Sequence, residues 1–95
     1  MRHHVAPVAA MRALEVAARH LSFTRAAAEL NITQSAVSHQ IRHLEDLWGL
    51  KLFERHVRRL ELTSAGSALA PVMRDFFTRL EQTLDELTSA GAPAA

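Results

Sequence analysis

Four hydrogen-bonding side chains lie on one side of a predicted helix and have the chemistry to bind DNA bases. The helix is expected between Thr33 and Gly49. At about 100° per residue, four of its side chains lie within roughly one quadrant of the helix, namely Ser35, Ser38, His39 and Arg42. All four side chains can donate hydrogen bonds, and none is acidic. The opposite side carries an apolar stripe of Val37, Ile41 and Leu44, which indicates the face that packs on a core. The sequence therefore predicts a bare polar face that is suited to a DNA groove.

Further polar residues are placed to contact phosphates. Arg42 lies one turn beyond Ser38, where the DNA backbone is the nearer target; its alternative role is a surface pair with Asp46 at i+4. Thr24 and Arg25 open a second, shorter helix, whose free N–H groups and dipole favour an anion. The expected contacts with the DNA backbone are Thr24, Arg25, Thr33 and Arg42.

Two short helices with a tight break must position these side chains. The apolar residues Ala26, Ala27 and Leu30 give the first of the two its core stripe, and Ile32 in the break is expected in the core as well. Ser22 and Thr24 are both competent N-caps for that helix, and Thr33 caps the next one. Asn31 tolerates a left-handed backbone. The pattern predicts a helix-turn-helix whose turn lacks the glycine of many examples.

A helix from about Val8 to His20 is expected to supply the rest of the core. Its inward-facing residues should be Val8, Met11, Leu14, Ala17, Ala18 and Leu21. Trp48 continues the apolar face of the 34–48 helix, so we interpret it as a core residue and not as a stacking platform for a base.

Residues 51–62 alternate near their two ends and predict a two-stranded wing. Leu52, Leu60 and Leu62 are apolar, and residues 56–59 between them are polar or basic, apart from Val57. Arg58 and Arg59 are expected to approach a minor groove, where a narrow A·T tract concentrates negative potential. The alternative for both arginines is a plain role in solubility.

A last helix is predicted from the cap Thr63 to about Leu87, with a long apolar stripe. Its members, which we expect to form a dimer interface, are Leu69, Met73, Phe76, Leu80, Leu84 and Leu87. The stripe covers some seven turns at about 5.4 Å per turn, which is longer than a domain of this size can cover. The alternative is a helix that folds wholly onto its own core. The small residues from Thr88 onward predict a linker.

The charges are divided between the two ends of the chain. Residues 1–59 carry nine Lys and Arg against five Asp and Glu, whereas residues 60–95 carry two against five. Such a division favours an anionic partner at the basic end, although chance on a solvated surface is the alternative. The chain has no cysteine, and His39 and His43 have no acidic helper for a metal site. Scattered glycines, no nucleophile elbow and no paired carboxylates argue against an enzyme.

The chain resembles the DNA-binding region of LysR-type bacterial transcriptional regulators over about residues 10–87. The most specific stretches are SFTRAAAELNITQSAVSHQIRHLE, LFER and LTSAG. Within the family, TQSAVSHQIR most resembles the branch that contains regulators of glycine cleavage and of β-lactamase expression. The sequence departs from the family pattern at Ser35, where many members have proline, and at Val57, a wing position where glycine is frequent.

The resemblance implies a mainly α fold, a winged helix-turn-helix of three helices and a two-stranded wing, followed by a dimerisation linker helix. Family base contacts map onto Gln34, Ser35, Ser38 and His39, with Gln34 able to bond adenine in a bidentate fashion. A larger effector-binding domain follows in the family, so a trimmed fragment or a naturally short product is expected here. A small-molecule effector would act only through that missing domain.

The sequence thus predicts a bacterial, cytoplasmic transcription factor module that binds double-stranded DNA as a homodimer, without cofactor, metal or membrane contact. The competing function is a winged-helix module that binds a protein instead of DNA. We expect a disordered start over residues 1–7, the winged helix-turn-helix over 8–62, the linker helix over 63–88 and a hinge or tail over 89–95.

Overall fold

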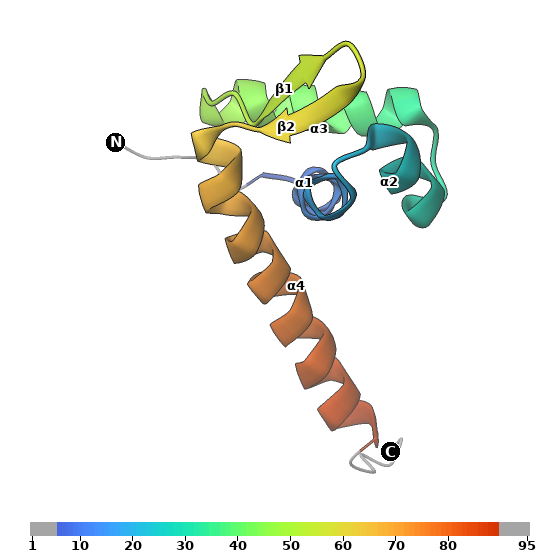
Figure 1. Cartoon of the computed structure of the whole chain (residues 1–95). Coiled ribbons are helices and arrows are strands. Elements are labelled where there is room, and N and C mark those ends of the chain that lie inside the picture. The colour runs from blue at the N-terminus through green and yellow to red at the C-terminus, as the bar shows by residue number, and fades with distance from the viewer. Residues whose placement is uncertain (1–5, 90–95) are drawn as a thin grey trace.

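The computed structural model describes residues 6–89 and is mainly α-helical. Its elements are, in order, α1 (Val8–His20), α2 (Phe23–Leu30), α3 (Gln34–Trp48), β1 (Phe53–His56), β2 (Arg59–Leu62) and α4 (Ser64–Ser89). Figure 1 shows α1 almost end-on between the other helices, the β1–β2 hairpin lying along α3, and α4 projecting away from the rest. The structure confirms the predicted fold class, a winged helix-turn-helix followed by a long helix.

The core is built around α1, which packs against α2, α3 and α4. Its largest fully buried side chains are Leu14, Val16, Val37, Ile41, Leu44, Leu52 and Phe53. Trp48 packs at the edge of this core, as predicted. Ala6 is buried and Pro7 is the N-cap of α1, so these two residues of the expected disordered start belong to the folded part. Residues 1–5 of that start, and 90–95 of the expected tail, lie outside the described residues.

Three apolar residues that we expected in the core are exposed. Val8 opens α1 and is 60% exposed, because at about 100° per residue it lies on the side of the helix opposite the buried Ala10 and Ala17. Leu21 follows the last residue of α1 in a left-handed conformation, with φ of 49°, so it has left the helical face that points inward. Ile32 lies in the turn between α2 and α3, where no helix sets its direction, and is 42% exposed.

The break between α2 and α3 forms as its residue types predict. Asn31 adopts the left-handed conformation, with φ of 58°, and ends α2 without a glycine. The Thr33 hydroxyl accepts a hydrogen bond from the Ala36 N–H at 3.0 Å and caps α3. At the start of α2 the cap is Ser22, whose hydroxyl accepts from the Arg25 N–H at 3.1 Å. The Thr24 side chain therefore does not cap α2, and its hydroxyl is available for another contact.

The wing is an antiparallel hairpin whose two-residue turn is Val57-Arg58. His56 and Arg59 are the last paired residues, and neither turn residue has a positive φ. Turns of types I′, II′ and II all need at least one positive φ, so this turn requires no glycine. Val57 is therefore accommodated at the tip, where it is 97% exposed.

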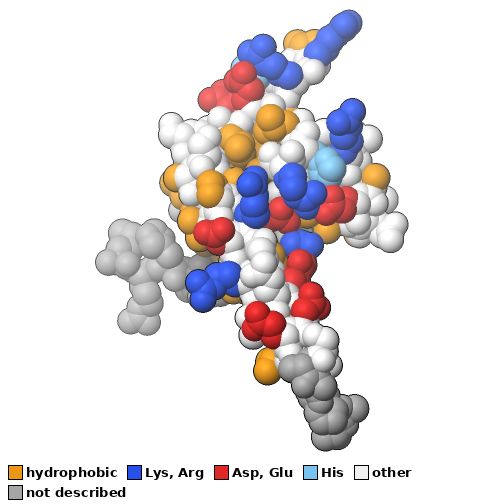
Figure 2. Space-filling model, turned by 60° about the horizontal axis from the view of Figure 1, so that its bottom comes forward, with side chains coloured by type: hydrophobic (Ala, Val, Ile, Leu, Met, Phe, Trp, Pro, Cys, Tyr) orange, Lys and Arg blue, Asp and Glu red, His pale blue; other side chains and the backbone are white. Residues whose placement is uncertain are grey.

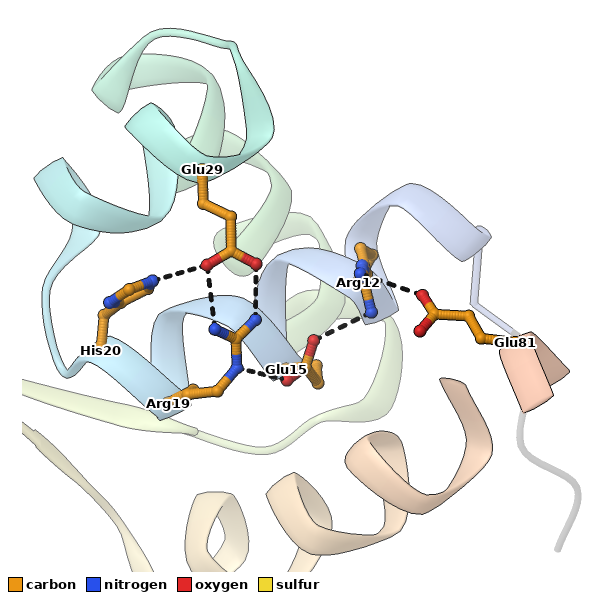
Figure 3. A network of polar contacts seen from close by, with 6 residues as sticks. All are labelled: Arg12, Glu15, Arg19, His20, Glu29 and Glu81. Atoms are coloured by element: carbon orange, nitrogen blue, oxygen red, sulfur yellow. Dashed lines mark hydrogen bonds and ion pairs between the residues drawn. The ribbon is translucent and has the colours of Figure 1, made fainter. Parts of the chain in front are cut away.

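An ion-pair network joins α1, α2 and α4. Glu15 is only 5% exposed, and its carboxylate accepts hydrogen bonds from Arg12 at 3.0 Å and Arg19 at 2.9 Å. Figure 3 shows how the network extends from these residues to Glu29 of α2 and to Glu81 of α4. Arg12 also lies over the Phe77 ring, 4.9 Å from its centroid. The network therefore fixes the direction in which α4 leaves the winged helix-turn-helix.

Candidate nucleic-acid interface

The predicted recognition face of α3 is largely open to solvent. Gln34, Ser35, His39 and Arg42 are exposed, and Ser38 is half-buried. The apolar stripe on the other side is fully buried, so α3 is held by one face and presents the other. Within residues 6–89 Arg42 forms no ion pair with Asp46, which leaves its guanidinium available for a phosphate.

Ser38 is half-buried because it has a partner that the sequence analysis missed. Arg55 of β1 donates a hydrogen bond from Nη2 to the Ser38 hydroxyl at 2.7 Å. The Arg55 guanidinium also lies over the Phe23 ring, 4.8 Å from its centroid. The alternation along β1 was the available signal, because Phe53 and Arg55 share one face of the strand.

Gln34 is also held by a neighbour. The Thr24 hydroxyl donates a hydrogen bond to the Gln34 side-chain carbonyl at 3.1 Å. Thr24 was predicted as a phosphate contact, and this hydrogen bond gives it a second role at the base-reading end of α3. Its neighbour Arg25 is exposed and, within the described chain, forms no ion pair.

A cleft of about 560 Å³ separates the start of α2 from the wing. Thr24, Arg25 and Gln34 line one side, and Arg55, Arg58 and Arg59 line the other. Arg59 is partly neutralised by Glu61 at 3.1 Å, whereas Arg58 makes no ion pair within residues 6–89. The two wing arginines expected in a minor groove therefore differ, and Arg58 is the more available cation.

The acidic end of the chain lies away from this cleft. In Figure 2 red acidic side chains gather along the protruding part of α4, whereas blue Lys and Arg side chains lie at the far end of the view, beside some red ones, and across its middle. The described residues contain no group of three His, Asp or Glu side chains arranged to hold a metal ion. No helix among them is long and apolar enough to cross a membrane.

A recognition helix with an exposed polar face, a basic wing and a helix-turn-helix core define a DNA-binding module of the winged helix-turn-helix class. Residues 8–67 match the model for the bacterial regulatory helix-turn-helix proteins of the lysR family. The chain therefore belongs to the LysR family, and it is a DNA-binding module of that family.

Two relatives show how much of a regulator the chain covers. It is 53% identical over 83 residues to the HTH-type transcriptional activator AmpR of Providencia stuartii, which covers 87% of this chain and 28% of the relative. It is 46% identical over 95 residues to the glycine cleavage system transcriptional activator of Escherichia coli K12, and this match covers 100% of this chain and 31% of the relative. The chain thus spans less than a third of these curated relatives. Both are transcriptional activators, in agreement with the expectation that the chain is not an enzyme.

Solved structures confirm the architecture. The complex of the BenM DBD with catB site 1 DNA superimposes with a TM-score of 0.82 at 28% identity, covering 92% of this chain and 96% of that one. A Corynebacterium glutamicum OxyR mutant with bound H2O2 gives a TM-score of 0.84 at 28% identity, covering 94% of this chain and 28% of that one.

Proposed function

We propose that this chain recognises specific double-stranded DNA sites by placing the N-terminal half of α3 in the major groove. The observation that carries the proposal is the exposed, acid-free face at the start of α3, beside a cleft lined with arginines. The base-contacting residues are Gln34, Ser35, Ser38 and His39. The similarity to a BenM DBD structure determined with DNA supports this placement.

The surrounding side chains fix the position of the module on the duplex. Arg25 and Arg42 bind phosphates on either side of α3, with Thr33 and the free N–H groups of the α2 start beside them. Arg58 enters the adjacent minor groove, with Arg59 behind it. Backbone contacts of this kind orient the protein, and the α3 contacts supply the choice of sequence.

The chain works as a homodimer through α4. Four large apolar side chains of α4 are 44–60% exposed although they follow one helical stripe, namely Phe76, Leu80, Leu84 and Leu87. Leu69 and Met73, nearer the start of the stripe, pack on the chain's own core. A second copy on this stripe would present two recognition helices to successive major-groove faces of a pseudo-palindromic site.

The function is tested by selecting bound duplexes from a randomised pool and titrating the best duplex with salt. Three free arginines per subunit, Arg25, Arg42 and Arg58, give about six phosphate neutralisations per dimer, so log Kd should change against log salt with a slope of roughly 5. Gln34→Ala and Ser38→Ala should reduce discrimination between sites more than affinity for random DNA. Recovery of no duplex, together with salt-insensitive binding to a protein, would support a protein-interaction module instead.

The dimer is tested separately with the double variant Phe76→Asp/Leu80→Asp. Two buried carboxylates at the centre of the stripe would prevent association, because charges in an apolar interface lose their hydration. The variant should sediment as a monomer and bind the selected palindrome at least tenfold more weakly. A half-site duplex should bind both proteins equally, which controls for loss of folding.

The relatives support a proposal about where this module works in the cell. They are bacterial transcriptional activators and are more than three times as long, so we propose that the module acts on chromosomal DNA in the bacterial cytoplasm. A small-molecule effector would act, as the family resemblance implies, through a C-terminal effector-binding domain and not through the described residues.

A further inference from the structure

The hydrogen bond between Arg55 and Ser38 restricts what Ser38 can offer to DNA. A guanidinium has donors only, so the Ser38 hydroxyl oxygen must be the acceptor in this 2.7 Å bond. A hydroxyl that accepts one hydrogen bond still has its own hydrogen, and that hydrogen turns away from the cationic donor. The oxygen keeps a second lone pair, but the cationic donor already bound to it weakens that lone pair as an acceptor and strengthens the O–H as a donor, so Ser38 acts preferentially as a donor toward the open side of α3.

Arg55 is held firmly enough to impose this arrangement. Its guanidinium lies over the ring of Phe23, which is 7% exposed. The same ring meets Phe53 edge to face, with centroids 5.4 Å apart. Phe53 and Arg55 are two residues apart on β1, so both reach Phe23 from one face of the strand. The stack replaces part of the hydration that a guanidinium loses there.

The wing strand is also fixed along α3 at a second point. The Glu45 carboxylate accepts hydrogen bonds from the N–H groups of Leu52 at 2.8 Å and Phe53 at 3.4 Å. The distance along the helix axis from Glu45 back to Ser38 is about 10 Å. The distance along an extended strand from Leu52 to Arg55 is also about 10 Å. The two spans match, so β1 follows α3 toward its N-terminus and delivers Arg55 to Ser38.

We propose that Arg55 is a positioning residue that biases Ser38 toward hydrogen-bond donation, so that a base with an acceptor in the major groove is preferred opposite Ser38. The inference rests on the proposed DNA-binding function and specifies its chemistry. Guanine, adenine and thymine present N7, O6 or O4 acceptors there, whereas cytosine presents its N4 amino donor. Cytosine is therefore the base that this position disfavours.

The experiment compares four forms of the 95-residue chain on the selected duplex and its single-pair variants: wild type, Ser38→Ala, Arg55→Met and the double variant. Discrimination at the base pair facing Ser38 should fall about 3- to 10-fold in each single variant. The double variant should lose no more than either single one, because both changes remove the same contact. Preferences at the other positions should stay those of the wild type.

Two further variants separate positioning from simple charge. Arg55→Lys keeps the charge but lacks the planar stacked fork, so it should not restore discrimination. Arg58→Met, the matched control, removes an exposed wing arginine; it should weaken binding to all duplexes and combine additively with Ser38→Ala. Uniform weakening by Arg55→Met that Arg55→Lys restores would overturn the proposal, because it identifies Arg55 as a phosphate contact.

A measurement on the wild-type chain decides the question even where Arg55→Met does not fold. The facing base is replaced by an analogue without its major-groove acceptors: 7-deazaadenine for adenine, 7-deaza-2-aminopurine for guanine, which lacks both N7 and O6, or 5-methyl-2-pyrimidinone for thymine. Wild-type affinity should fall about 3- to 10-fold, and Ser38→Ala should be insensitive to the change. Cytosine facing Ser38 in the selected sites, or equal affinity for the analogue, would refute the inference. If the proposed function itself were wrong, the wild type would select no duplex at all. That result is distinguishable from failure of the inference about Arg55 and Ser38.

Discussion

At the residue scale, the start of α3 is preorganised by neighbours from other elements. Gln34 has its carbonyl oriented by the Thr24 hydroxyl, 3.1 Å away. Bidentate bonding to adenine needs that carbonyl and the amide nitrogen of Gln34 in one plane facing the base edge. A side chain that is already oriented loses less rotamer freedom on binding, so, if Gln34 reads a base as proposed, the Thr24 hydroxyl would contribute to base choice.

Thr24→Val tests whether Thr24 acts through Gln34 or through a phosphate. Valine has nearly the same shape, so only the hydroxyl donor is removed. We expect a loss of discrimination at the base pair read by Gln34 of about 1 kcal/mol, the usual worth of one such hydrogen bond. The measurement is the Kd for duplexes altered at that pair and elsewhere. A loss shared equally by all duplexes would instead indicate that Thr24 contacts the backbone.

At the element scale, the junction of the wing with α4 explains the residues of the LTSAG stretch. Thr63 caps α4 by accepting from the Gly66 N–H at 3.0 Å, and its hydroxyl donates to the Lys51 carbonyl at 2.5 Å. Gly66 lies so close to Leu52 that a Cβ would overlap the Leu52 carbonyl oxygen and come within 2.9 Å of Leu62 Cδ2. Because residue 66 has no side chain, the first turn of α4 can pack directly against the backbone of Leu52, just before β1.

Gly66→Ala should destabilise the protein although alanine is the better helix former. The added methyl group meets backbone of the wing, which cannot turn aside as a flexible side chain does. We expect a loss of about 1 to 3 kcal/mol in the free energy of unfolding, measured in urea. Ser67→Ala, one residue further along and exposed, is the control and should change stability by less than about 0.5 kcal/mol.

The bounds of the elements were predictable because local chemistry sets them. Ser22, Asn31, Thr33 and Gly49 act as caps through their own side chains or backbone, so sequence alone located α2 and α3. The contacts of Arg55 were missed because they join residues 17 positions apart on a strand and a helix. The exposure of Leu21 was missed because the apolar pattern of the first helix was continued to Leu21, one residue past the predicted end at His20, where the backbone turns left-handed.

The link between α1 and α2 depends on pH through Glu29. Hydrogen bonds from Arg19 first, and then from His20, lower the Glu29 pKa from 4.5 to about 2. In the unfolded chain this carboxyl takes up its proton at higher pH, so its stabilising contribution is present above about pH 4.5 and is lost as the pH falls toward 2. The pair is solvent-exposed, so its worth is about 1 kcal/mol at most.

Glu29→Gln should therefore remove part of the acid sensitivity of unfolding. Urea midpoints at pH 5 and pH 3 should differ less for this variant than for the wild type. Glu54→Gln is the matched control, because Glu54 forms no ion pair within residues 6–89 and so has none to lose. An identical loss of stability in wild type and Glu29→Gln would show that the network does not hold α2 onto α1.

At the scale of the whole molecule, α4 extends well beyond the hydrophobic core of the chain. The radius of gyration is 15.1 Å, against about 12 Å for a compact chain of this length. All residues of 78–89 are exposed, and Figure 1 shows this part of α4 clear of the other elements. Isolated helices of about 12 residues are marginal in water, so we expect a partner on the stripe to stabilise this half of α4.

Hydrogen exchange provides the test of where that partner comes from. In the dimer, amides of residues 80–89 should exchange at least tenfold more slowly than in the monomeric Phe76→Asp/Leu80→Asp variant, because only a second copy covers the stripe. Amides of α1 and α3 should be equally protected in both proteins, since the core does not depend on the dimer. Diluting the wild type below its dissociation constant should reproduce the exchange of the variant. Slow exchange that persists in the monomer would mean that Arg12 and its bond to Glu81 suffice to order α4, and that the linker helix is rigid before two copies meet.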